Sequence, residues 1–313
     1  MILCIGLSPT VQRTLFFDHF SPEQVNRAKE TQITASGKAV NVARVISILG
    51  GAPHLVQIVG GDSGRFVAHS LERQGIANTS VPVQNDAATR TCVTILSPGQ
   101  APTELVEEVP PITDLDIAAI RSAARPLLPH SRALCLSGSF PPGVPVRFYA
   151  DLVHEANSLG VLSFVDAQKA PLLEALGEKP FLVKPNLDEA FATLGLTRSD
   201  DDQADASTAV VALQEAGSTW ALVSMGKAGS LLGGEGRMWH INPPQVDAVN
   251  PIGSGDSLTA GLVYAHIRQG KPIPEAVVFG TACAAANCLS LTSGVVEPRD
   301  VERFLPQVQI RPL

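Results

Sequence analysis

A single carboxylate stands directly behind three small residues near the end of the sequence. The residues are GSG at 253–255 followed by Asp256, and apolar side chains recur at helical spacing from 258 to 267 before Gly270 ends the pattern. The GSG turn therefore precedes a helix N-terminus, where unpaired backbone N–H groups and the helix dipole favour an anion. Two interpretations are open: an anion site with Asp256 beside it, or a loop in which Asp256 only caps the helix.

Asp256 can act only if other elements bring reactive groups to it. Short apolar runs rich in β-branched residues predict buried strands at 2–7, 54–59, 133–136, 161–165, 181–183 and 221–224. Amphipathic stretches predict helices at 63–75, 114–124, 145–160 and 207–217. This alternation is typical of an α/β fold with a doubly wound, mostly parallel sheet.

Two segments lack this alternation, at about 12–35 and 89–109. The first contains RTLFF, and the second contains TRTCVTIL and TELVEEV, separated by SPGQ. Because neither segment has an obvious crossover helix, they predict a small antiparallel sheet that projects from the main domain, where a substrate lid would be built. No interdomain linker is visible, so we expect residues 1–313 to form one domain with a discontinuous lid.

Composition argues against several classes of function. The 313 residues are 45% hydrophobic and carry a formal net charge of −7, which argues against binding of nucleic acids or anionic membranes. The N-terminus lacks a basic region and no apolar run reaches about 18 residues, so we expect neither a signal peptide nor a membrane span. Five scattered cysteines without C-x-x-C spacing predict buried free thiols and a reducing cytoplasm.

In open α/β sheets, ligands collect beyond the carboxyl ends of the strands. In this sequence the predicted strands are followed by SPTVQ, SGSFPPG, Asp166, KPNLDE and MGKAG, and another helix is preceded by ASGKAVNVA. Glycines, polar groups and basic residues are therefore expected to converge on one edge of the sheet.

These motifs resemble the ribokinase-like carbohydrate kinases, often called the PfkB family. NPIGSGDSLTAGLV is similar to the C-terminal signature of that family, SGKAVNVA to its N-terminal GGKGINVA motif, and KPNLDE to its PNxxE element. SGSFPPG, TRTCVTIL, TELVEE and VNRA resemble stretches of the branch of tagatose-6-phosphate kinases and 1-phosphofructokinases, in the same order. The resemblance covers nearly the full length and implies a Rossmann-like α/β fold with a β-sheet lid.

The same resemblance implies an enzyme that transfers the γ-phosphoryl group of ATP to a sugar hydroxyl. Asp256 would be the general base, and the N–H groups of Gly253, Ser254, Gly255 and Asp256 would hold the migrating charge. The implied acceptor is a phosphorylated ketohexose: tagatose 6-phosphate, fructose 6-phosphate or fructose 1-phosphate. The alternatives are a kinase for an unphosphorylated sugar or nucleoside, and a non-catalytic sugar-phosphate sensor. A homodimer is left open.

The resemblance also assigns the groups around ATP. Asn186 and Glu189 resemble the family pair that organises Mg²⁺ through its waters; the alternative is that Asn186 caps the following helix and Glu189 favours its first turn. The implied nucleotide-binding residues are Ser224, Gly226, Gly229 and Asn287.

On the acceptor side, the resemblance implies that Gly37, Lys38 and Asn41 bind the sugar and that Arg90 binds its phosphate. Two more candidates are Ser139 and Arg27.

The acceptor motifs depart from the family pattern at three places. Gln12 stands where the branch carries a carboxylate that binds sugar hydroxyls. The Gln12 amide can still form hydrogen bonds with hydroxyls, but it carries no negative charge. Ser36 and Ala39 replace two glycines of the N-terminal motif, so the backbone there is expected to approach a sugar less closely. The identity of the acceptor therefore stays open.

Overall fold

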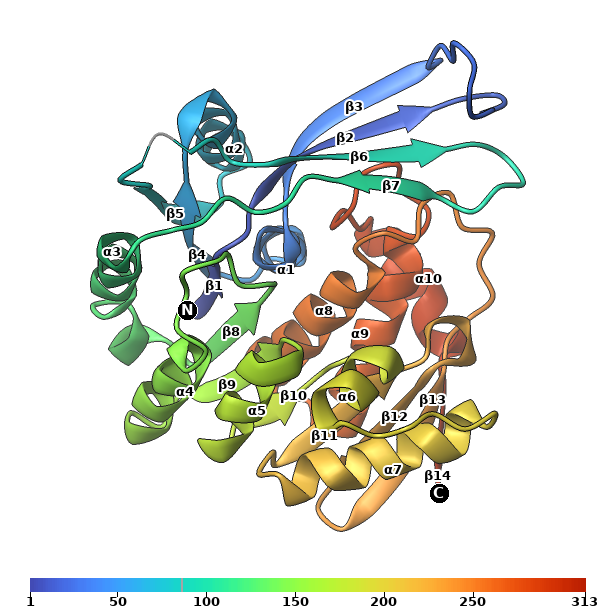
Figure 1. Ribbon diagram of the computed structural model, residues 1–313. Coiled ribbons are helices and arrows are strands. Elements are labelled where there is room, and N and C mark those ends of the chain that lie inside the picture. The colour runs from blue at the N-terminus through green and yellow to red at the C-terminus, as the bar shows by residue number, and fades with distance from the viewer. Residues whose placement is uncertain (86) are drawn as a thin grey trace.

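The computed structural model describes residues 1–85 and 87–313 (Figure 1). Its strands are β1 (Ile2–Gly6), β2 (Thr10–Phe16), β3 (Glu30–Ser36), β4 (Pro53–Val59), β5 (Ala77–Pro82), β6 (Thr91–Leu96), β7 (Thr103–Val106), β8 (Ala133–Ser137), β9 (Leu162–Asp166), β10 (Leu182–Val183), β11 (Trp220–Ser224), β12 (Ser230–Gly234), β13 (Arg237–Asn242) and β14 (Gln309–Pro312). Its α-helices are α1 (Lys38–Ile48), α2 (Gly61–Arg73), α3 (Asp114–Ala124), α4 (Phe148–Ser158), α5 (Lys169–Gly177), α6 (Leu187–Leu194), α7 (Asp202–Glu215), α8 (Ser254–Gln269), α9 (Ile273–Asn287) and α10 (Pro298–Phe304).

The main body is built on a ten-stranded sheet with the order β14-β13-β12-β11-β10-β9-β8-β1-β4-β5. Neighbouring strands from β5 to β11 are parallel, and β11 to β14 pair antiparallel at one end. The carboxyl ends of β1, β8, β9 and β10 therefore meet at one edge of the sheet. The predicted α/β fold with a mostly parallel sheet is confirmed.

The predicted strands are all present and agree with the structure to within one residue at each end. The helices predicted at 63–75, 114–124 and 145–160 correspond to α2, α3 and α4. The fourth, α7, begins at Asp202 rather than at 207, because the Asp201 side chain caps it by accepting from two backbone N–H groups at 3.0 Å.

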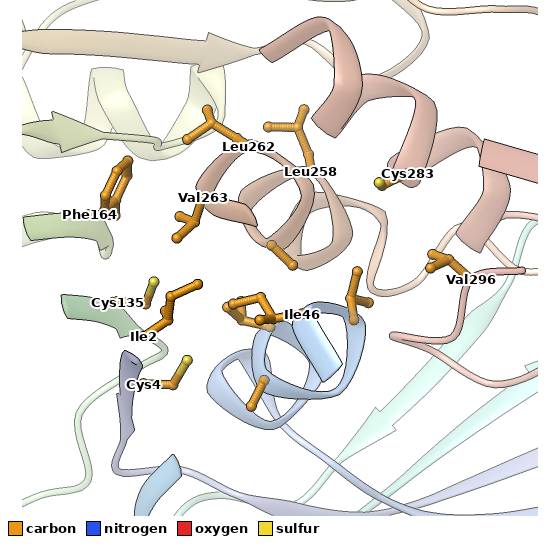
Figure 2. Packing of buried hydrophobic residues seen from close by; sticks show 14 of the residues in the cluster. Ile2, Cys4, Ile46, Cys135, Phe164, Leu258, Leu262, Val263, Cys283 and Val296 are labelled. Atoms are coloured by element: carbon orange, nitrogen blue, oxygen red, sulfur yellow. The ribbon is translucent and has the colours of Figure 1, made fainter. Parts of the chain in front are cut away.

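Helices cover both faces of the large sheet, and each face has its own apolar core. Successive residues of a strand point to opposite faces, so Cys4 joins the core under α1 and α8, whereas Leu3 joins the core under α3 and α4. Figure 2 shows Val263 of α8 directed toward Phe164 and the strands, with Ile46 of α1 in the same apolar cluster. This packing fixes where α8 begins, and so where Asp256 lies.

The two segments predicted to form a lid do make a separate four-stranded sheet, with the order β3-β2-β6-β7, that projects from the main body (Figure 1). The expectation of a purely antiparallel sheet is wrong, because β2 and β6 pair in parallel from Val11↔Thr91 to Phe16↔Leu96. The chain between them passes through α1, β4, α2 and β5 of the main body and re-enters the small sheet from the same end. That long crossover is what a parallel pair requires.

Within residues 1–85 and 87–313, no helix has both the length and the apolar composition to span a membrane. The prediction of buried free thiols is confirmed for Cys4, Cys92, Cys135 and Cys283, while Cys288 is partly exposed.

Candidate active site

The GSG turn leads into α8 as the sequence predicts. Gly253 has a φ of 83°, and a Cβ there would come within 2.9 Å of a neighbouring backbone nitrogen, so only glycine fits. The Ser254 N–H donates to the Pro251 carbonyl at 3.2 Å and is used within the turn. Gly255 and Asp256 lie in the first turn, where N–H groups have no acceptor within the helix.

Asp256 is buried at the start of α8, with 7% of its surface exposed. The Asn41 side chain donates from Nδ2 to Asp256 Oδ2 at 2.8 Å. Burial raises the pKa of Asp256 to about 6, and the Asp166 carboxylate adds to the rise, while Lys38, the Asn41 hydrogen bond and Lys184 oppose it. The interpretation of Asp256 as a simple helix cap is wrong, because Gly253 occupies the cap position.

Four charged side chains from separate elements meet near Asp256. Asp166, at the end of β9, is 2% exposed and accepts from Lys38 and Lys184 at 2.8 Å each. Lys38, the first residue of α1, also lies 3.6 Å from Glu189 Oε1. The cluster brings together motifs that are far apart in the sequence and lies at the carboxyl edge of the sheet, as predicted for the polar motifs.

The pKa values in this cluster favour its ionised form. Burial alone would raise the pKa of Asp166, but Lys184 and Lys38 lower it to about 2. Burial would lower the pKa of Lys38, yet the carboxylates of Asp166, Glu189 and Asp256 raise it above the ordinary value. The cluster therefore holds fixed charges, whereas Asp256 is the carboxyl whose pKa lies near neutrality.

Asn186 and Glu189 form a reciprocal cap at the start of α6. Asn186 Oδ1 accepts from the Glu189 N–H at 2.8 Å, and Glu189 Oε2 accepts from the Asn186 N–H at 2.9 Å. The capping alternative raised from the sequence is therefore confirmed. Glu189 keeps a second oxygen, Oε1, on the side of Lys38. Oε1 is not used by the cap and lies 3.6 Å from Lys38 Nζ, and a carboxylate oxygen of this kind suits Mg²⁺, which in kinases is held by one or two carboxylates together with phosphates.

The predicted nucleotide-binding residues do not share one environment. Ser224 lies beside Asn186, to which it is joined by an isolated parallel bridge. Gly226 is exposed in the loop after β11, and Gly229 is buried at the start of β12. Ser224 and Gly226 therefore border the same edge as the charged cluster.

Asn287 is fully buried, with 0% exposure, and its amide is used inside the protein. Its Oδ1 accepts from Ser257 Oγ at 3.1 Å and from the Gly294 N–H at 2.7 Å, and its Nδ2 donates to the Ile252 carbonyl at 2.9 Å. The expected contact of Asn287 with the nucleotide stays a prediction. Its amide holds the loop that leads into Gly253.

Two acceptor-side predictions lie at the start of α1 and beside it. Gly37 precedes α1 with a φ of 114°, and a Cβ there would lie 2.9 Å from the Ser8 carbonyl oxygen. Ser139 is exposed after β8 and donates to Ser8 Oγ at 3.3 Å. Both residues therefore meet the loop that follows β1.

Gln12 and Asn41 are buried and hydrogen-bonded to protein groups. Gln12 lies on β2, is 5% exposed and donates to Thr94 Oγ1 at 2.8 Å, so it links two strands of the small sheet. Asn41 is 4% exposed and is bonded to Asp256. The structure thus assigns Asn41 a contact with the carboxylate that the sequence did not predict.

Arg90 and Arg27 lie apart from the charged cluster. Arg90 stands at the base of the small sheet, where Nη1 donates to the Glu107 carbonyl at 3.3 Å. Its buried Nε has no hydrogen-bond partner within the described residues, and the side chain lines a shallow pocket with Pro9 and Gly60. Arg27 is exposed in the loop between β2 and β3.

Sequence reasoning missed the roles of Asp166 and Lys184. Asp166 was noted only as a polar residue after a strand, and Lys184 only as the first letter of KPNLDE. A usable signal was their position, because each follows a buried run of a parallel sheet and must therefore reach the same edge.

Taken together, these groups suit the transfer of a negatively charged group. A helix start can hold an anion, a buried carboxyl with a pKa of about 6 can take a proton, and lysines flank both. Phosphoryl transfer depends mainly on such positioning and charge stabilisation. The fold and site are therefore those of an α/β kinase that acts on a small-molecule hydroxyl.

Comparison with known proteins agrees with this class. The model of the pfkB family of carbohydrate kinases matches residues 1–298, and the chain belongs to that family. A tagatose-6-phosphate kinase of Staphylococcus epidermidis is 30% identical over 312 residues, which is 99% of each chain.

Solved structures show the same fold. Phosphofructokinase-2 from Escherichia coli, in complex with potassium, is 23% identical with a TM-score of 0.87 over 98% of each chain. A ribokinase from Arabidopsis thaliana, complexed with ribose and ATP, is 20% identical with a TM-score of 0.73 over 97% of this chain and 98% of that one.

Proposed function

We propose that this protein uses ATP to phosphorylate a hydroxyl of a phosphorylated ketohexose. The observation that carries the proposal is the buried Asp256 at the start of α8, next to Lys38, Asp166 and Lys184. The similarity to a tagatose-6-phosphate kinase over the full length supports a phosphorylated acceptor.

In this mechanism Asp256 orients the acceptor hydroxyl and takes its proton. The hydroxyl oxygen forms a bond to the γ-phosphorus as the bond to the β-phosphate oxygen breaks, and ADP leaves. The first-turn N–H groups of Gly255 and Asp256 stabilise the negative charge on the oxygens of the phosphoryl group during transfer. A carboxyl with a pKa of about 6 is largely ionised at pH 7 and can therefore act as the base.

We further propose that Glu189 would help to hold Mg²⁺, through a metal-bound water, with Oε1, the oxygen that the cap does not use and that lies 3.6 Å from Lys38 Nζ. When bound, Mg²⁺ would neutralise charge on the phosphates. Asn186 keeps Glu189 oriented through the reciprocal cap, so both residues contribute to the site.

For the acceptor, Arg90 is the proposed phosphate-binding cation. Lys38 is already paired with Asp166 and Glu189, whereas no ion pair joins Arg90 to a carboxylate of the described residues. Closure of the small sheet over the carboxyl edge would exclude water during transfer, which is the role of a lid.

The proposal is tested by an ADP-release screen with Mg-ATP across free sugars, sugar phosphates and nucleosides. We expect the highest kcat/KM with a ketohexose phosphate. Turnover only with free sugars or nucleosides would show that the acceptor is unphosphorylated and that the proposed acceptor class is wrong. Binding of sugar phosphates with no turnover of any acceptor would identify a sensor instead of an enzyme.

We also propose that the protein works as a cytoplasmic homodimer. Its five cysteines are free thiols, which suits a reducing compartment. The small sheet exposes apolar side chains that a second copy could cover: Ile33 is 45% exposed, and Leu105 and Val106 are each 56% exposed. Light scattering tests the dimer, and Leu105→Lys is expected to shift it toward the monomer.

A further inference from the structure

Arg44 is a buried arginine on the inner side of α1. It is 4% exposed, and none of the carboxylates in residues 1–85 and 87–313 forms an ion pair with it. Burial lowers the pKa of Arg44 to about 10. Burying a cation lowers the free energy of unfolding unless its N–H groups are hydrogen-bonded. The hydrogen-bond partners of Arg44 therefore indicate its role.

The guanidinium of Arg44 bonds to four neighbours on different elements. Nη1 donates to Asn41 Oδ1 at 3.2 Å and to the Ser293 carbonyl at 3.3 Å. Nη2 donates to the Ala35 carbonyl at the inner end of β3, and Nε donates to Gln74 Oε1 at 2.7 Å. These partners are all neutral acceptors.

The contact with Arg44 favours the same orientation of the Asn41 amide as the Asp256 carboxylate does. A guanidinium can only donate, so it holds Oδ1 of the amide toward itself and leaves Nδ2 to face Asp256. The hydroxyl of Ser36, which also contacts Oδ1 at 3.1 Å, can donate or accept and does not by itself select an orientation. If the amide were reversed, its oxygen would face the Asp256 carboxylate and repel it.

The same guanidinium also ties the small sheet to the anion-binding turn. Ala35 lies on β3, and Ser293 packs against Gly253, because a Cβ on that glycine would lie 2.9 Å from the Ser293 Cβ. Arg44 therefore contacts the lid strand, the residue that holds Asp256, and Ser293, which packs against the turn.

We propose that Arg44 is a positioning residue for phosphoryl transfer, which orients Asn41 so that it donates to Asp256. Arg44 itself touches neither substrate nor reacting atoms. This inference rests on the proposed function of Asp256 as the base.

The test is a double-mutant cycle of Arg44→Met and Asn41→Ala in the full-length protein, measured as kcat with saturating Mg-ATP and acceptor. A charge-assisted contact that acts through Asn41 is expected to give about a tenfold to hundredfold fall in kcat for Arg44→Met. In the Asn41→Ala background the same change should lower kcat less than about threefold, because the amide it orients is gone. KM for both substrates should change little.

Controls separate positioning from general stability. Gln74→Leu removes only the Nε partner and should leave kcat near the parent value. Arg44→Lys keeps a donor and should recover part of the kcat lost in Arg44→Met; if the methionine variant does not fold, the lysine variant takes its place in the cycle. Equal losses of kcat in both backgrounds, or a parental kcat for a folded Arg44→Met protein, would overturn the inference.

The outcome for Asp256→Asn distinguishes the two hypotheses. If Asp256→Asn keeps its kcat, the proposed base is wrong. If Asp256→Asn is inactive while the cycle is additive, the base assignment stands and only the role of Arg44 is wrong.

Discussion

Replacing Asp256 by Asn is expected to stabilise the fold while removing most of the activity. The carboxyl is buried, and its pKa is about 6 instead of the ordinary 3.8. A raised pKa means that the folded state disfavours the ionised form, so ionisation of Asp256 lowers stability as the pH rises from 3.8 through 6. The penalty is complete above that range and absent below it.

The magnitude follows from the two pKa values. Their difference of about 2 units, at about 1.4 kcal/mol per unit, corresponds to about 3 kcal/mol of stability lost at pH 8. Asn carries no charge, and its side-chain oxygen can still accept from Asn41 Nδ2. Asp256→Asn should therefore be more stable than the parent by up to about 3 kcal/mol at pH 8 and similar to it at pH 3.5.

Urea unfolding at pH 3.5, 6 and 8 measures this difference, and ADP release measures kcat on the same preparations. We expect kcat to fall by about 10²- to 10⁴-fold, the usual contribution of a positioned general base. A control is Asp116→Asn on α3, another buried carboxylate, which accepts from Gln84 and Thr113 instead of from residues of the site and should leave kcat unchanged. An unchanged kcat in Asp256→Asn, or a free energy of unfolding that is lower than the parent at pH 8, would refute the reasoning.

Three more predictions test other parts of the site. In the parent, kcat/KM should fall about tenfold per pH unit below a midpoint near pH 6, because protonated Asp256 cannot act as the base; a flat profile from pH 5 to 8 would contradict this. Glu189→Gln should raise the Mg²⁺ concentration for half-maximal activity, whereas a role limited to the α6 cap predicts only a small loss of thermal stability. Arg90→Ala should lower kcat/KM for a ketohexose phosphate by about tenfold to a hundredfold, mainly through KM, and an equal effect on an unphosphorylated sugar would show that Arg90 is structural.

Six strands of the large sheet were predictable because burial on both faces gives a continuous apolar run in the sequence, whereas β5, β12, β13 and β14 were not predicted. Runs such as β8 and β11 are continuous and apolar, and glycine or polar residues bound them. The helix α9 was not predicted from the sequence, because it is buried on nearly all sides and therefore has no polar face and no amphipathic period. The parallel pairing of β2 and β6 was not predicted either. Pairing between distant segments depends on where the chain re-enters a sheet, and local sequence patterns do not encode this.

In the site, the chemical type of a residue was predictable and its partner was not. Asp256 and Glu189 could be selected as carboxylates at helix starts, since the turn and cap signals are local. The contacts of Asp166 with Lys38 and of Asn41 with Asp256 each join residues more than a hundred positions apart in the sequence, so local patterns do not show them. The hydrogen bonds of Asn287 inside the protein were not predictable either, because the sequence does not show whether a polar residue on a helix bonds to the protein interior or to a ligand.

The balance of charges around Asp256 affects whether the site can bind an anionic acceptor. The cluster contains two lysines and the carboxylates of Asp166 and Glu189, with Asp256 as a further acid that is largely ionised at neutral pH. A carboxylate at position 12 would add a further negative charge to a site that must accept ATP and, in our proposal, a second phosphate. Gln12 avoids that repulsion, and its contact with Thr94 keeps the amide on the small sheet. Because Lys38 is already paired with carboxylates, we expect the selection of an anionic acceptor to depend on Arg90 and on the uncharged Gln12 rather than on a pair of free cations.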